Sequence, residues 1–161
     1  MRVDTLEVAV AAAKRIRGWL EIAANPLDLA IRLYVADVFF KSALTKIEDW
    51  DKTLFLFEEL YRVPLLSPAV AAALGTFGEL VFPPLLALGL AARFSAASLS
   101  VVNITAVVSY WHVIGQNEAA LMSHVFWGAL LLVTLAHGPG KLSLDHWIRR
   151  WLERPSRGDE S

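Results

Sequence analysis

Several polar and ionisable side chains interrupt the long apolar stretches of this sequence, and they are the residues best placed to do chemistry. Asp37 and Lys41 are four residues apart, so a helix would carry them on one face in the favourable acid-before-base order. Glu79 and Asn103 each lie about midway along a separate apolar run. Because a charge inside a bilayer costs about 2.5–3.5 kcal/mol, such residues are expected to face the interior of a helix bundle.

These residues predict a polar layer at mid-membrane depth that is reached from one surface. Glu79 would give or take a proton there, and Lys41 would set the charge around it. His124 lies about two turns inside its apolar run, and His112 lies at the rim. The candidate catalytic residues are therefore Glu79 and Lys41, and the candidate ligand contacts are Asp37, Asn103, His124 and His112.

Each of these residues also has a purely structural interpretation. Asp37 and Lys41 could simply neutralise each other, and Asn103 could be an interhelical hydrogen bond. Two histidines could in principle hold a haem, but a turn near Gly115 would leave His112 about two turns short of the level of His124. We therefore expect no bis-histidine haem and no metal site, and no nucleotide-binding or hydrolase motif occurs.

The composition indicates an integral membrane protein. Hydrophobic residues make up 56% of the 161 residues, and the mean hydropathy is +0.48. Charged residues make up 19%, below the roughly 25% of soluble domains. A net charge of −1 gives no field that would attract nucleic acid. The chain has no cysteine, which excludes disulfides, thiolate metal sites and a thiol relay within it.

Four apolar runs are long enough to cross about 30 Å of hydrocarbon as helices. The weakest is the first run, because it contains Arg32, Asp37 and Lys41, but Asn25-Pro26 predicts a helix start just before it. We therefore predict an all-α membrane four-helix bundle with short interfacial amphipathic helices. Its spans are 27–44, 69–92, 94–111 and 118–137.

The loop charges predict the orientation of the bundle. Lys and Arg gather near both termini and at Arg93, whereas the turn 112–117 contains neither. Positively charged loops face the cytoplasm, so we expect both termini there.

Three amphipathic segments complete the predicted organisation. Residues 1–25 form a cytoplasmic interfacial helix, mainly 4–24, and residues 50–61 form an external helix. The bundle occupies 26–137. After a Gly-Pro-Gly break, 138–161 form a second cytoplasmic amphipathic helix, capped by Ser143, and a polar tail.

The order of short motifs resembles the DoxX family of four-span inner-membrane proteins. Arg32 precedes Phe39-Phe40-Lys41-Ser42-Ala43-Leu44-Thr45-Lys46, and Trp50-Asp51, Phe57 and Val63-Pro64 follow, as in that family's first span and external helix. Glu79 ahead of Leu88-Gly89-Leu90 and Arg93 is similar to its second span, and Gly138-Pro139-Gly140-Lys141-Leu142-Ser143-Leu144-Asp145 is similar to its terminal motif. Together these motifs extend from Arg32 to Asp145.

The resemblance implies a subunit of a membrane redox or stress-protection complex, with an outward pocket for a quinone or small solute. If it has an enzymatic role, that role is as part of a quinone-linked oxidoreductase, beside a protein partner or in a homo-oligomer within the lipid bilayer. A non-enzymatic scaffold is the first alternative. A small-molecule or metal transporter, with its second span broken at Pro83-Pro84, is the next.

Overall fold

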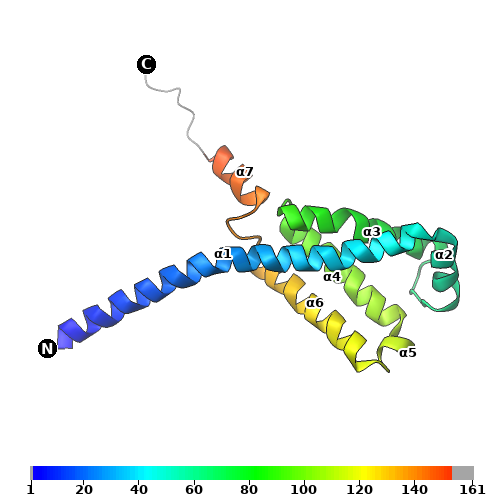
Figure 1. Ribbon diagram of the computed structural model, residues 1–161, viewed down its shortest axis with the longest axis horizontal. Coiled ribbons are helices and arrows are strands. Elements are labelled where there is room, and N and C mark those ends of the chain that lie inside the picture. The colour runs from blue at the N-terminus through cyan, green and yellow to red at the C-terminus, as the bar shows by residue number, and fades with distance from the viewer. Residues whose placement is uncertain (1, 154–161) are drawn as a thin grey trace, which may run out of the picture.

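The computed structural model describes residues 2–153, and over that range the chain is built from helices joined by short turns. Figure 1 shows their arrangement. The helices are α1 (Arg2–Glu48), α2 (Trp50–Glu59), α3 (Pro68–Leu88), α4 (Ala92–Ser109), α5 (Trp111–Ile114), α6 (Glu118–His137) and α7 (Leu144–Leu152). The predicted polar tail from residue 154 onward lies outside the described residues.

Four helical segments pack side by side. The second half of α1 lies against α3, α3 against α4, and α4 against α6, and α6 closes the bundle by touching α1. The core is an apolar cluster to which all four contribute: Val35, Phe39, Leu86, Ala96, Leu99 and Leu131. The all-α bundle predicted from the sequence is therefore confirmed.

Helices α3, α4 and α6 are each long and apolar enough to cross a membrane. The predicted span 118–137 coincides with α6, while α3 and α4 begin and end within a few residues of their predicted spans. The first predicted span, 27–44, forms part of α1 and packs as the fourth member of the bundle, but its charged residues keep it below the apolar level of the other three.

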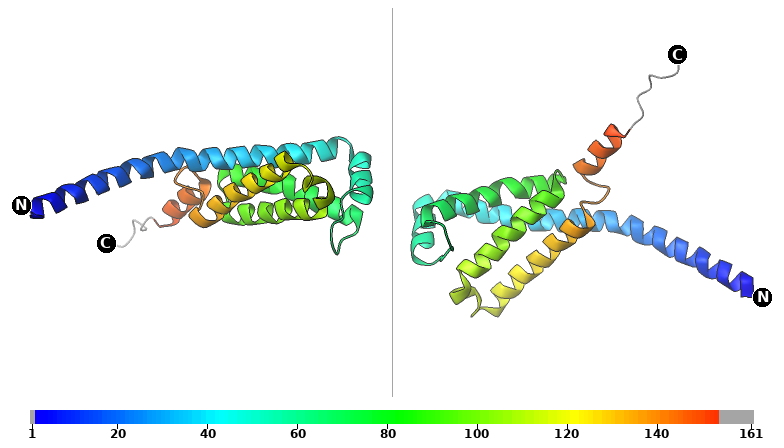
Figure 2. Two further views of the ribbon diagram at one scale, coloured as in Figure 1. Left: turned by 90° about the horizontal axis from the view of Figure 1, so that it is seen from below. Right: turned by 180° about the vertical axis from the view of Figure 1, so that it is seen from behind.

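The expected helix start at Asn25-Pro26 is wrong, because α1 continues through Pro26 as one helix of 47 residues. A proline inside a helix removes one backbone hydrogen bond without always ending the helix. The Asn25 side chain does not cap the helix; it accepts a hydrogen bond from the backbone N–H of Lys141, 3.1 Å away. Residues 2–24 therefore extend α1 beyond the bundle instead of forming a separate helix (Figure 2).

The predicted break at Pro83-Pro84 is also absent, since α3 is continuous from Pro68 to Leu88. The two prolines cannot donate to the carbonyls one turn earlier, those of Glu79 and Leu80. The helix ends instead at Gly89, whose φ of 68° lies in the left-handed region that favours glycine.

The short helices α2 and α7 are each capped by a side chain. The Asp49 side chain caps α2 by accepting a hydrogen bond from the Lys52 backbone N–H. The Ser143 side chain caps α7 by accepting one from the His146 backbone N–H, which confirms the cap predicted at Ser143. Helix α2 folds back over the start of α3, where Phe57 is buried against Ala71 and Ala72. This packing closes the end of the bundle opposite the chain's N-terminus (Figure 1).

Candidate functional site at the α2 end of the bundle

An ion pair between Lys46 and Glu79 lies at the α2 end of the bundle. Lys46 Nζ is 2.5 Å from Glu79 Oε2, and it also donates to Ser42 Oγ at 2.7 Å. Only 19% of the Lys46 side chain and 9% of the Glu79 side chain are exposed. A charge pair this deeply buried loses most of its hydration, so each partner depends on the other.

A cleft of about 820 Å³ opens beside this pair. The end of α1 and helix α2 form the wall of the cleft. Lys46 is the cationic residue of this wall that lies nearest the bundle core, where it bonds Glu79. Thr53 joins the two helices by donating to the Lys46 carbonyl at 2.9 Å. Polar and aromatic side chains share the lining, among them Ser42, Lys46, Trp50, Thr53, Phe57 and Tyr61.

Aromatic rings form one side of the cleft. Tyr61 packs between Phe57 and Tyr110 with its ring tilted against both, and the ring centres are 4.7 and 4.8 Å away. Burial, together with the charges of Tyr110 and Glu79, raises the pKa of the Tyr61 hydroxyl. It therefore keeps its proton at neutral pH and remains a hydrogen-bond donor.

The buried hydroxyl of Thr76, near the ion pair, has no hydrogen-bond partner among the described residues. Thr76 precedes Glu79 by three residues and so lies on the same face of α3. Buried hydroxyls nearly always have a hydrogen-bond partner, so this one is an exception next to the ion pair.

The predicted partnership of Glu79 with Lys41 and Asp37 is not found. Lys41 Nζ bonds Asp37 Oδ2 at 2.8 Å, but both side chains are exposed, by 71% and 56%, on the outer side of α1. The residues of α1 that pack inward include Arg32, Phe39 and Lys46. Lys46, and not Lys41 as predicted, is therefore the cation that pairs with Glu79.

Asn103 and His124 form a polar pair of their own between α4 and α6. Asn103 Nδ2 donates to the His124 carbonyl at 2.9 Å, and Asn103 Oδ1 lies 2.8 Å from His124 Nδ1. His112 is exposed and touches only the ring of Tyr110 among the contacts described, 5.4 Å away. The structure therefore divides the expected polar layer into separate clusters. Among the side chains that the structure describes, no three of His, Asp or Glu gather as a metal site.

We predict that Asn103→Leu weakens the fold without changing the cleft. Interhelical side-chain hydrogen bonds contribute about 0.6 kcal/mol on average and up to about 1.7 kcal/mol, so a loss of roughly 1 kcal/mol is expected. Thermal unfolding in detergent measures this change. A loss of ligand binding at the cleft without a loss of stability would instead assign Asn103 to the binding site.

A second buried cluster, the Arg32 clamp, fixes the opposite end of the bundle. The Arg32 side chain is fully buried and donates to the carbonyls of Leu86, at 3.2 Å, and Ala87, at 2.8 Å, at the end of α3. It also donates to the carbonyl of Leu142. A side chain on Gly89 would collide with Arg32 and Ser143, so this approach requires glycine.

The loop before α7 completes the Arg32 clamp. The Asp145 carboxylate accepts from the backbone N–H groups of Ala91 at 2.8 Å and Ala92 at 2.9 Å, and so caps α4. The Asp145 N–H in turn donates to the Gly89 carbonyl at 2.9 Å. The motif Gly138–Asp145 thus ties α7 to the turn between α3 and α4.

The chain is similar to proteins of one known family. The family DoxX matches residues 27–112, which include the inward face of α1, the cleft, α3 and α4. An uncharacterized protein of Haemophilus influenzae (strain ATCC 51907 / DSM 11121 / KW20 / Rd) is 32% identical over 130 residues, covering 76% of this chain and 83% of that protein. No solved structure matches the chain significantly. The chain therefore belongs to the DoxX family of membrane proteins.

Proposed function

We propose that the protein is a membrane-embedded binding subunit whose cleft beside Lys46 takes the headgroup of a quinone. The observation that supports this most directly is the buried Lys46–Glu79 pair at the edge of an open cleft. The loop charges predict that both termini lie on the cytoplasmic side of the inner membrane. In that orientation this cleft faces outward.

The residues of the cleft fit a quinone ring. A quinone presents two carbonyl acceptors on a flat apolar ring and therefore needs donors and an aromatic wall. Lys46 has three N–H donors, of which Glu79 and Ser42 take two, and the Tyr61 hydroxyl supplies another donor. The rings of Phe57 and Tyr61 supply the wall.

The chain's own residues would bind the headgroup and manage a proton. A bound quinone supplies the ability to take up two electrons and two protons. Lys46 would hold a carbonyl oxygen, and Glu79, reached through Lys46, would store or release a proton inside the bundle. The chain has no cysteine, so thiol-derived electrons must come from a partner protein of a redox or stress-protection complex.

Quinone binding can be tested by fluorescence, because Trp50 lines the cleft. Titration of the purified protein with decylubiquinone should quench tryptophan emission, and Trp50→Phe should remove most of the quenching. Tyr61→Phe keeps the ring and loses one neutral hydrogen bond, worth about 0.5–1.5 kcal/mol, so the Kd should rise roughly 2- to 10-fold.

Tyr34→Phe is the matched control, because Tyr34 lies on α1 away from the cleft and contacts Phe126 of α6. Its Kd should equal that of the wild type. Quenching that is unaffected by Trp50→Phe and Tyr61→Phe would contradict quinone binding in this cleft. It would favour the scaffold alternative, in which the ion pair serves only to hold α1 and α3 together.

A further inference from the structure

Helix α1 carries an apolar stripe on the part that extends past the bundle. Residues 2–24 add about 35 Å of helix beyond the level where α3 and α6 end, which takes them out of the hydrocarbon layer. The stripe consists of the residues of this segment whose relative exposure is 60–69%: Val8, Ile16, Trp19, Leu20 and Ile22. In water, an apolar stripe of this length calls for a covering surface.

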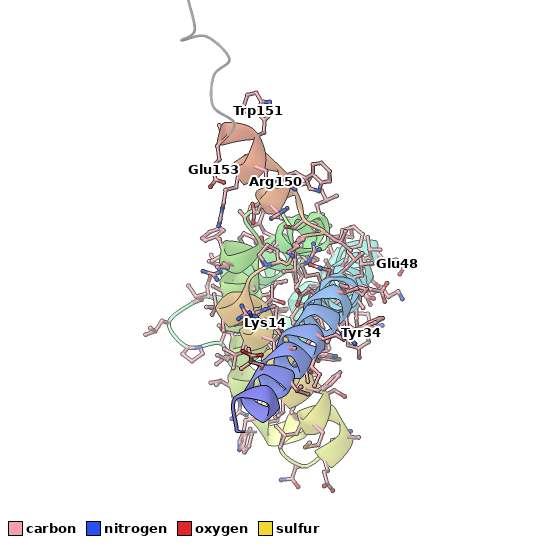
Figure 3. All side chains as sticks on the ribbon, turned by 90° about the vertical axis from the view of Figure 1, so that its left-hand side faces the viewer. Lys14, Tyr34, Glu48, Arg150, Trp151 and Glu153 are labelled. Carbon is pink, nitrogen blue, oxygen red and sulfur yellow. The ribbon has the colours of Figure 1, made fainter. Side chains whose placement is uncertain are left out.

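The same face of α1 carries the Asp37–Lys41 pair farther along, within the bundle. At 3.6 residues per turn, Val8, Ile16 and Trp19 lie within about 40° of the mean direction of Asp37 and Lys41, and the basic Arg15 borders them at about 60°. The inward residues Arg32 and Phe39 lie roughly 180° away. Figure 3, which looks from the N-terminal side, shows Lys14 and Tyr34 on opposite sides of α1.

This face has the wrong polarity for each surrounding medium. Apolar side chains are exposed where α1 lies outside the membrane, and an ion pair is exposed where α1 lies inside it. Exposure of that pair to lipid is costly. A single helix laid along the whole face would remove both costs.

We infer that a second copy of this chain covers the face, with two α1 helices side by side and parallel. A two-fold axis along the membrane normal keeps both copies in the same orientation and brings identical surfaces together. The Asp37–Lys41 pair is self-complementary, because each acid can also bond the lysine of the other copy, one turn away. Beyond the membrane, the apolar stripes of the two copies pack as a short coiled coil.

Cysteine cross-linking tests this dimer directly, because the natural chain has no cysteine. In membranes treated with copper phenanthroline, the full-length Ile16→Cys protein should form a covalent dimer. The matched control Lys14→Cys lies on the opposite side of the same exposed segment and should stay monomeric. Equal cross-linking of both variants, or of neither, would overturn the proposal.

Charge exchange tests the membrane part of the interface. Lys41→Asp places four acids at the two-fold axis and should reduce the Ile16→Cys dimer several-fold. The exchange of both residues, Asp37→Lys with Lys41→Asp, should restore it. Quenching of a fluorophore on Ile16→Cys by nitroxide lipids would show the segment lying on the bilayer and would also overturn the dimer. Quinone quenching at Trp50 should stay unchanged in these variants, so the cleft and the dimer can fail separately.

Discussion

Replacement of Arg32 by methionine should remove most of the folded protein from membranes. Methionine keeps an unbranched chain of similar reach but leaves the carbonyls of Ala87 and Leu142 without the guanidinium that bonds them. A fully buried polar group without its partner costs about 1–3 kcal/mol, and these two carbonyls are partly buried, so together they cost at most about 6 kcal/mol. Against a total stability of about 5–15 kcal/mol, this is a large fraction.

The change should appear as a lower midpoint of thermal unfolding in detergent. For a chain of this size, 1 kcal/mol shifts the midpoint by about 2–4 °C. Arg32→Lys should give an intermediate loss, because one ammonium replaces a fork that bonds both α3 and the loop before α7. Leu33→Met changes the neighbouring exposed residue and should leave the midpoint unchanged. An Arg32→Met protein as stable as this control would show that the Arg32 clamp does not hold the bundle.

The bundle could be predicted from the sequence because three of its helices are strongly apolar over their whole length. The run 118–137 has turn residues on both sides, so its bounds match α6. The continuity of α1 could not be predicted in this way. Asn25-Pro26 reads locally as a helix start, and the bond from Asn25 to Lys141 that decides otherwise is formed between residues 116 positions apart.

The candidate site was predicted only in part, and helix periodicity explains why. Glu79 was correctly expected to be buried, since no interface lies within its reach. Its partner was misassigned, because Lys41 forms the obvious pair with Asp37 four residues earlier. The spacing Arg32, Phe39, Lys46 repeats every seven residues and indicates the inward face, and this signal could have identified Lys46.

Replacement of Lys46 by methionine should destabilise the protein by about 3–5 kcal/mol, the usual effect of removing one partner from a buried ion pair. The Glu79 carboxylate, 9% exposed, would be left without a counter-charge. The double change, Lys46→Met with Glu79→Gln, removes both charges and should recover most of the lost stability. Thermal unfolding of the wild type, both single variants and the double variant gives the coupling energy of the pair.

A second cycle on Asp37→Asn and Lys41→Met is the control, measured in detergent at a protein concentration at which the wild type is first verified to be monomeric. Its coupling should be at most about 1 kcal/mol, because both side chains are exposed. A Lys46–Glu79 coupling as small as this would show that the buried pair does not depend on mutual neutralisation.

The double variant also separates a binding site from a structural pair. It restores the fold but lacks both the Lys46 donor and the Glu79 carboxylate that the proposed cleft requires. If the cleft binds a quinone, the Kd of the stable double variant for decylubiquinone, measured by quenching, should rise at least about 10-fold. The reason is that a hydrogen bond to a charged group contributes about 1.5–3 kcal/mol. If the double variant instead binds decylubiquinone with the wild-type Kd, the ion pair is not needed for binding. It then serves only to hold α1 and α3 together.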